Sequence, residues 1–272
     1  MTGTALTARE TGARLVTRRR TLVACTVATS SLDPRTIADA FALFERAYEG
    51  ADRARFAKDL AEKQLVILLR DRDSGALKGF STVLLQERPG KRPAVVVFSG
   101  DTVIDREYWG QKQLQIAFTT LLLRLKLRSP RRRVYWFLIS KGYRTYLLLA
   151  NAFTRAVPRF DRSSDDELQQ HLHELASARF GAQYDRESGV IRYDAAHERV
   201  REGLAPITDR HCRNPHVQFF VERNPGHASG DELACLAEVR FRDLARIGGR
   251  IALALGRKAL GIDARASERT SA

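Results

Sequence analysis

Three apolar runs between residues 64 and 104 constrain the fold of this chain more than any other feature. The stretch QLVILLRDRDSGALKGFSTVLLQER (64–88) holds two of them, separated by Asp73, Ser74 and Gly75, which is a good hairpin signal. RPAVVVFSGDTVI (92–104) is a third run after a Pro-Gly turn. Together they predict three strands that follow one another as a meander.

Helices and further strands surround this meander. TLVACTVATS (21–30) is rich in β-branched residues and predicts a first strand. DPRTIADAFALFERAYEG (33–50) predicts an amphipathic helix, capped by Asp33 and opened by Pro34. RVYWFLIS (133–140) predicts a strand buried on both faces. Helices are also predicted at 52–63, 107–128, 143–153, 163–181 and 230–260, and one more strand at 216–226.

This order of elements predicts an α/β chain in which helices alternate with a meander of three strands and further single strands. We expect a flexible basic arm at 1–20 and a core at 21–160. A C-terminal extension at 161–272 is expected to pack one strand and amphipathic helices on that core. At 44% hydrophobic residues, the chain can bury a sizeable core.

The chain is strongly basic, with a formal net charge of +14 and a sequence pI of about 10.2. A basic surface attracts nucleic acid, anionic lipid or phosphorylated ligands. The alternative explanation of the charge is a GC-rich genome, in which arginine codons are favoured. No nucleic-acid-binding motif is visible, so no specific nucleic-acid partner is predicted. The helix expected at 231–260 has an apolar face and many arginines, and it either packs on the core or makes a peripheral membrane contact.

Cysteine and histidine usage indicates a reducing compartment. Cys25, Cys212 and Cys235 form no close pair, so we predict no disulfide framework and a cytoplasmic protein. His211 and His216 flank Cys212, but no second ligand pair has zinc-site spacing, and no metal is predicted. RRRTLVAC (18–25) lacks room for the apolar region of a signal peptide, and no run of 18 apolar residues predicts a membrane span.

The segment VIDREYWGQKQL (103–114) joins a predicted strand to a predicted helix, a shape that often binds phosphate. Over residues 21–160 the chain resembles the GNAT acyltransferase superfamily, mainly in element order. The resemblance implies a mixed, mostly antiparallel central sheet flanked by helices, with a helical C-terminal extension. The family motif places Ile104, Tyr108, Trp109 and Gly110 at its Val, Tyr, Arg and first Gly, whereas Lys112 and Leu114 replace later glycines. The resemblance implies that this segment binds the pyrophosphate of coenzyme A through Val103, Ile104, Trp109, Gly110, Gln111, Lys112, Gln113 and Leu114.

The resemblance also implies catalytic residues. In the family a Tyr on the helix after the next strand protonates the leaving thiolate, and that position falls on Leu148 here, with Tyr143 and Tyr146 nearby. Asp101 is the carboxylate on the strand before the loop. We therefore predict catalytic roles for Asp101, Tyr143 and Tyr146. The alternatives are a turn cap for Asp101 and core packing for the two tyrosines.

Two functions follow from these observations. The first is an acyltransferase that moves an acyl group from an acyl-CoA-type thioester to an amine or hydroxyl of a small molecule. It would use acyl-CoA or CoA as cosubstrate and no tightly bound cofactor. The alternative is a catalytically inactive GNAT-shaped protein that binds a ligand, a lipid or a partner protein, which the replaced glycines and Leu148 favour. The sequence does not indicate an oligomeric state.

Overall fold

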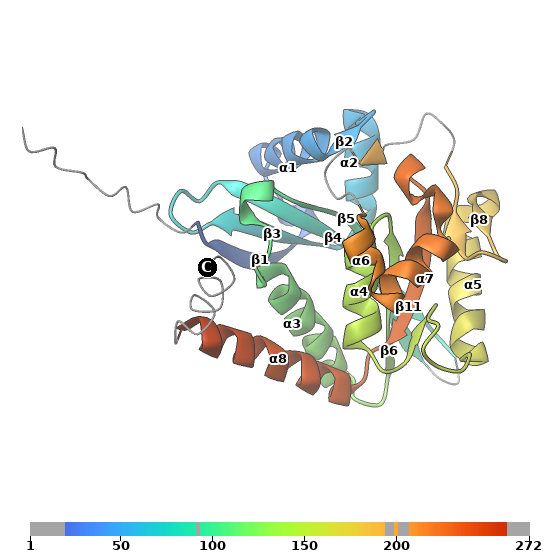
Figure 1. The fold of residues 1–272 in the computed structure, drawn as a ribbon. Coiled ribbons are helices and arrows are strands. Elements are labelled where there is room, and N and C mark those ends of the chain that lie inside the picture. The colour runs from blue at the N-terminus through green and yellow to red at the C-terminus, as the bar shows by residue number, and fades with distance from the viewer. Residues whose placement is uncertain (1–19, 91–92, 194–198, 201–206, 260–272) are drawn as a thin grey trace, which may run out of the picture.

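The computed structural model describes residues 20–90, 93–193, 199–200 and 207–259 (Figure 1). The basic arm expected at 1–20 lies almost wholly outside them. The strands are β1 (Leu22–Ala28), β2 (Tyr48–Glu49), β3 (Leu65–Asp71), β4 (Leu77–Arg88), β5 (Ala94–Ile104), β6 (Arg133–Ser140), β7 (Ala156–Val157), β8 (Tyr184–Asp185), β9 (Val190–Ile191), β10 (Arg199–Val200) and β11 (Glu232–Glu238). The α-helices are α1 (Pro34–Ala47), α2 (Arg53–Glu62), α3 (Gln113–Arg128), α4 (Tyr143–Ala152), α5 (Asp166–Phe180), α6 (Asp209–Cys212), α7 (Pro215–Arg223) and α8 (Phe241–Ala259).

A mixed, largely antiparallel sheet forms the centre of the molecule, as the sequence predicted. Its strands lie in the order β1-β3-β4-β5-β6-β11-β9-β8, and β7 pairs with β11. β5 and β6 run parallel, whereas β1–β3, β3–β4, β4–β5 and β6–β11 are antiparallel. The predicted hairpin is confirmed: Asp71 accepts hydrogen bonds from the Ser74 backbone and hydroxyl at 2.8 Å, and Gly75 adopts a positive φ of 70° in the turn.

Helices cover both faces of the sheet. In Figure 1, α1 and α2 lie on one side of the sheet and α3 and α8 on the other. Alternate residues of a strand point to opposite faces, and β6 follows this rule. Its Val134, Trp136 and Leu138 join the cluster with α3 and α4, while Tyr135 and Phe137 join the cluster under α5. β6 is therefore buried on both faces, as its continuous apolar run predicted.

The C-terminal extension differs from the sequence prediction in two places. Residues 216–226, predicted as a strand, form most of helix α7, which Asn214 caps by accepting from the His216 backbone at 3.0 Å. The helix predicted at 230–260 is divided between strand β11 and helix α8. Because β11 pairs with β6 through the register Leu233–Ser140, the central sheet continues beyond the expected core boundary at residue 160. Within the described segments, no helix is long and apolar enough to cross a bilayer.

Candidate active site

The parallel strands β5 and β6 separate before they end. Their pairing runs from Ala94–Arg133 to Ser99–Leu138, and β5 then continues to Ile104 without a partner in β6. A cavity of about 610 Å³ lies where the two strands part. It is lined by Gly100–Ile104 from β5, by Lys141–Thr145 after β6, and by side chains of α1, α2 and α5. This volume is typical of small-molecule sites, which occupy about 300–1,000 Å³.

A β-bulge aims Asp101 into this cavity. Ser81 pairs with Thr102 but Val83 pairs with Ser99, so β5 has one extra residue opposite β4. Before the bulge, odd-numbered residues such as Val97 join the α3–α4 face. After the bulge, Val103 joins the α1–α2 cluster, and Asp101 shares the face of Val103. Gly100 is needed here, because a Cβ at this position would lie 2.5 Å from the Thr82 Oγ1 atom.

Asp101 carries a carboxylate that the protein does not neutralise directly. Among the described residues it makes no hydrogen bond and no ion pair, although it is only half-buried by surface area because it faces the cavity. Surrounding protein atoms desolvate the carboxylate, and Asp59 adds like charge. These two effects raise the pKa of Asp101 from its usual 3.8 to about 7, against the opposing influence of Lys141 and Lys63. Such a group can exchange a proton near neutral pH.

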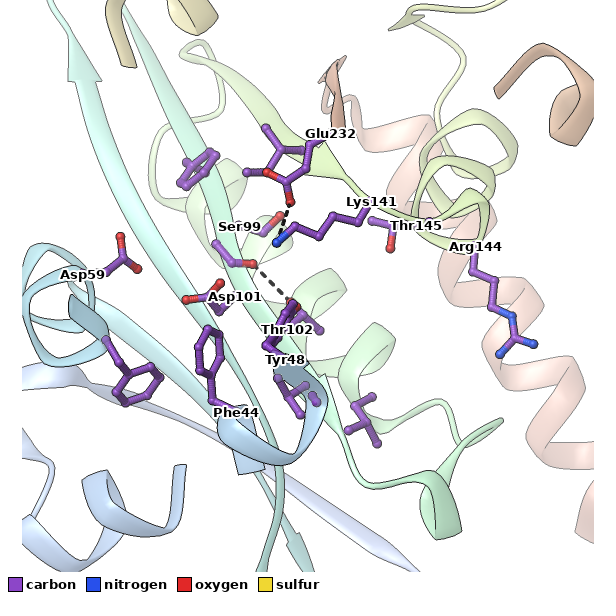
Figure 2. Close-up of a pocket in the computed structure, with 18 of the residues that line it drawn as sticks. Phe44, Tyr48, Asp59, Ser99, Asp101, Thr102, Lys141, Arg144, Thr145 and Glu232 are labelled. Atoms are coloured by element: carbon purple, nitrogen blue, oxygen red, sulfur yellow. Dashed lines mark hydrogen bonds and ion pairs between the residues drawn. The ribbon is translucent and has the colours of Figure 1, made fainter. Parts of the chain in front are cut away.

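A second carboxylate of the cavity, Glu232, lies at the start of β11 and is buried. It accepts a hydrogen bond from the Tyr193 hydroxyl at 2.6 Å, and the Lys141 Nζ atom lies 3.7 Å from its Oε1 atom. Burial raises the pKa of Glu232, while Lys141 and Tyr193 act in the opposite direction. Lys141 also lies 4.8 Å above the ring centre of Tyr48. Figure 2 shows Asp101 and the end of Lys141 in the same part of the cavity.

The other charges on this side are already paired. Lys63 contacts Asp59 at 2.6 Å, and Arg179 lies 3.9 Å from Asp59 and 3.7 Å from Glu62. The Arg179 guanidinium also stacks 4.3 Å from the Phe98 ring centre. In the part of the chain that the structure describes, no group of three or more His, Cys, Asp or Glu side chains could hold a metal ion.

The structure divides the predicted loop residues into two groups. Val103, Ile104, Trp109 and Gly110 line the cavity, whereas Gln111, Lys112, Gln113 and Leu114 do not. The Trp109 indole donates to the Ile104 carbonyl at 2.8 Å, and the Arg144 guanidinium lies 5.4 Å from the Trp109 ring centre. Gly110 adopts a positive φ of 81°, and apart from its chain neighbours, a Cβ added there would meet no atom of the described residues within 4 Å. The space beside Gly110 is therefore open.

The rest of the loop is fastened to neighbouring strands. Gln111 accepts from the Leu22 backbone at 2.9 Å and donates to the Arg20 carbonyl at 3.0 Å. Leu114 packs against the core, and the Gln113 Oε1 atom is buried and has no hydrogen-bond partner among the residues that the structure describes. Lys112 is exposed at the N-cap of α3 and makes no capping bond through its side chain, and the first turn contains no acidic residue. The first amides of α3 are thus uncapped by side chains.

The two predicted tyrosines lie in different environments. Tyr143 begins α4 and lines the cavity, with its ring 5.1 Å from that of His211. Tyr146 is fully buried between α4 and α7, does not line the cavity, and has its hydroxyl 3.4 Å from the His216 Nδ1 atom. Leu148, at the family's Tyr position, packs against the core. The structure thus brings Asp101 and Tyr143 to one cavity and leaves Tyr146 elsewhere.

Sequence reasoning missed Glu232 and Tyr193 at the site. Glu232 belongs to ELACLAE, whose residues favour helices, and only its pairing with β6 makes it a strand. A signal for the bulge was present, because an isolated Gly such as Gly100 inside a strand pattern suggests one.

Comparison with known proteins finds similarity in structure alone. No protein-family model matches the sequence, and no curated protein matches it. A Trypanosoma brucei acetyltransferase is 17% identical with a TM-score of 0.37, over 53% of this chain and 99% of the other. The Escherichia coli GNAT family N-acetyltransferase YhbS in complex with CoA is 16% identical with a TM-score of 0.36, over 56% and 73% of the two chains. The aminoglycoside N-acetyltransferase AAC(6')-Iy in complex with CoA is 10% identical with a TM-score of 0.38, over 56% and 99%.

These neighbours are similar to about half of this chain. The strand order and the parallel pair β5–β6 agree with the mixed, mostly antiparallel sheet that the sequence predicted.

Proposed function

We propose that this protein transfers an acyl group from an acyl-CoA thioester to an amine or hydroxyl of a small molecule. The observation that carries the proposal is the cavity between the separated strands β5 and β6. It brings Asp101, which makes no ion pair among the described residues, together with Tyr143 and with the loop that precedes α3. An acyl donor that entered between the strands would present its thioester to an acceptor held beside Asp101. Proximity of this kind supplies much of the rate in a two-substrate reaction.

The residues around the loop fit an anionic diphosphate. The first amides of α3 are uncapped by side chains, the first turn has no carboxylate, and the space beside Gly110 is open. A helix N-terminus of this kind attracts phosphate. Lys112 adds a positive charge at the same position, although Lys112 and Leu114 stand where the family has glycines. We assign Val103, Ile104, Trp109 and Gly110 to the thioester arm, and the segment 111–114 to the phosphates.

In this scheme Asp101 accepts the proton that the attacking group loses, since its pKa of about 7 allows it to be ionised at neutral pH. The Tyr143 hydroxyl, at the start of α4, donates a proton to the departing thiolate. Tyr146 is assigned to packing between α4 and α7, because it lies away from the cavity.

Calorimetric titration with CoA and with acyl-CoAs of several chain lengths tests the donor site. We expect binding, and we expect Lys112→Met to weaken it more than Lys58→Met, which removes an exposed lysine from α2. Absence of heat and of competition at millimolar ligand would refute the proposal.

The rival function, a GNAT-shaped binding protein without activity, is favoured by Leu148, which packs in the core where the family has its acid. Release of free thiol from acyl-CoA in the presence of an acceptor separates the two functions. An inactive protein would bind acyl-CoA, and thiol release would not depend on the acceptor or on Asp101.

A further inference from the structure

The part of the cavity beyond Asp101 has a wall of aromatic side chains. They come from α1, β2, α2, β5, α5 and the segment between β9 and β10, and we call them the aromatic wall: Phe44, Tyr48, Phe56, Phe98, Phe180 and Tyr193. Phe44, Phe56 and Phe98 are buried from solvent. Figure 2 shows Phe44 close to Asp101, while Arg144 points away on the opposite side of the cavity. An apolar group is therefore favoured next to Asp101.

The cations on this side of the cavity contact carboxylates other than Asp101 or lie at the solvent-exposed surface. Lys63, Lys141 and Arg179 each already contact a carboxylate, namely Asp59, Glu232 and the Asp59–Glu62 pair. A further cation, Arg55, is exposed to solvent. Asp101 is left as a carboxylate with no hydrogen-bond or ion-pair partner among the described residues. A desolvated carboxylate of this kind gains most from a ligand that brings its own positive charge.

We infer that the acceptor is a primary amine on an aromatic body, whose ammonium group pairs with Asp101 while its ring packs against the aromatic wall. The inference rests on the proposed acyl transfer and names its substrate class. A hydroxyl acceptor would leave the Asp101 charge without a counter-ion. An anionic acceptor would meet cations that are already paired.

The transfer step then balances as follows. The ammonium gives one proton to Asp101, and the free nitrogen forms a C–N bond with the thioester carbonyl carbon as the C–S bond breaks. The second proton that the nitrogen loses reaches the departing sulfur, through Tyr143 in the proposed scheme. The products are an amide and free CoA thiol, and Asp101 returns its proton to water.

Direct binding of three small probes tests the inference without requiring catalysis. The probes are 2-phenylethylamine, its neutral counterpart 2-phenylethanol, and ethanolamine, which keeps the amine but lacks the ring. Calorimetry at about pH 8 keeps Asp101 ionised, since its pKa is about 7. We expect 2-phenylethylamine to bind at least about tenfold more tightly than either other probe. 2-Phenylethanol lacks the charge-assisted hydrogen bond and ethanolamine lacks the buried ring, and each of these contributes about a factor of ten or more to the affinity.

Two variants complete the experiment. Asp101→Asn should lower the affinity for 2-phenylethylamine to that for 2-phenylethanol. The affinity for 2-phenylethanol should stay unchanged, which would show that the cavity of the variant is still folded. Asp166→Asn removes an exposed carboxylate from α5 and should alter neither affinity. Equal affinity of the wild-type protein for the amine and the alcohol would overturn the inference, as would an amine affinity that survives Asp101→Asn.

Failure here is distinguishable from failure of the proposed function. Acyl-CoA binding with acceptor-dependent thiol release, but without preference for 2-phenylethylamine, would refute the aromatic amine and leave acyl transfer standing. Tight 2-phenylethylamine binding without any acyl-CoA binding would refute acyl transfer itself.

Discussion

Helix α8 offers a test of how the C-terminal extension is held on the core. Leu244 is 4% exposed and belongs to the cluster beneath α3 and α4, whereas Leu253 on the same helix is 65% exposed. Asp243 accepts hydrogen bonds from the Thr154 backbone and hydroxyl, both at 3.2 Å. Arg250 donates to the Asn151 carbonyl at 3.1 Å, near the end of α4. These contacts favour a docked helix over a free membrane arm.

The matched substitutions Leu244→Ala and Leu253→Ala measure this docking. Both remove the same atoms from one helix, so helix propensity contributes equally to the two free energies of unfolding. Leu244→Ala empties a buried position and should cost about 2–5 kcal/mol. At about 2–4 °C per kcal/mol, this lowers the melting temperature by about 4–20 °C. Leu253→Ala should stay within about 0.5 kcal/mol of the wild-type protein.

Thermal and urea unfolding, followed by circular dichroism, give both values. Sedimentation with phosphatidylserine vesicles provides the second readout. Equal unfolding free energies for the two variants would contradict the docking argument. If Leu253→Ala reduced vesicle binding and Leu244→Ala did not, α8 would act as a peripheral membrane contact through its exposed face.

Three further predictions concern the site. Gly110→Val forces a β-branched residue to a φ of 81°, so it should lower stability by about 1–3 kcal/mol and weaken acyl-CoA binding in calorimetry, whereas Gly110→Asn should be milder. Tyr108→Phe removes the hydroxyl that donates to Asp71 at 2.9 Å. The pKa of Asp71 is lowered from 3.8 to about 2, mainly by Ser74 and then by Tyr108, so stability present above pH 3.8 is lost as pH falls toward 2. Between pH 3.8 and 2, Tyr108→Phe should therefore lose less free energy of unfolding than the wild-type protein, which unfolding measured at a series of acidic pH values would show. Transfer rates should rise with pH through about 7 as Asp101 ionises, and Asp101→Asn should remove this rise; a pH-independent wild-type rate would contradict the base role.

The meander was predictable because each strand carries its own signal. Alternating faces and the turn at 73–75 act over a few residues, so β3 and β4 appeared at nearly their observed bounds. Helix α7 could also have been found, since Asn214 and Pro215 form a helix start and Val217 and Phe220 occupy one face. The cluster of Phe and Val residues instead suggested a strand.

Glu232 could not be placed from local sequence. Its strand consists of Leu, Ala, Cys and Glu, which tolerate a helix, and it becomes a strand because β6 offers an unpaired edge about ninety residues earlier in the chain. Asp101 was found only because it precedes the loop. The bulge that turns its side chain toward α1 and α2 depends on the pairing of β4 with β5, which is a tertiary property.

Side-chain hydrogen bonds, more than glycines, hold the loop before α3 in place. Tyr108 is fixed by its hydrogen bond to the Asp71 side chain, and Gln111 is fixed by its bond to the Leu22 backbone, so hydrogen bonds to two strands set the path of the chain. Only Gly110 in this loop adopts a positive φ. Since the loop path is set by these bonds, the donors open to a ligand are the uncapped first-turn amides of α3 rather than the amides of a glycine-rich loop. Breaking the Gln111 anchor should therefore weaken acyl-CoA binding even though Gln111 does not line the cavity.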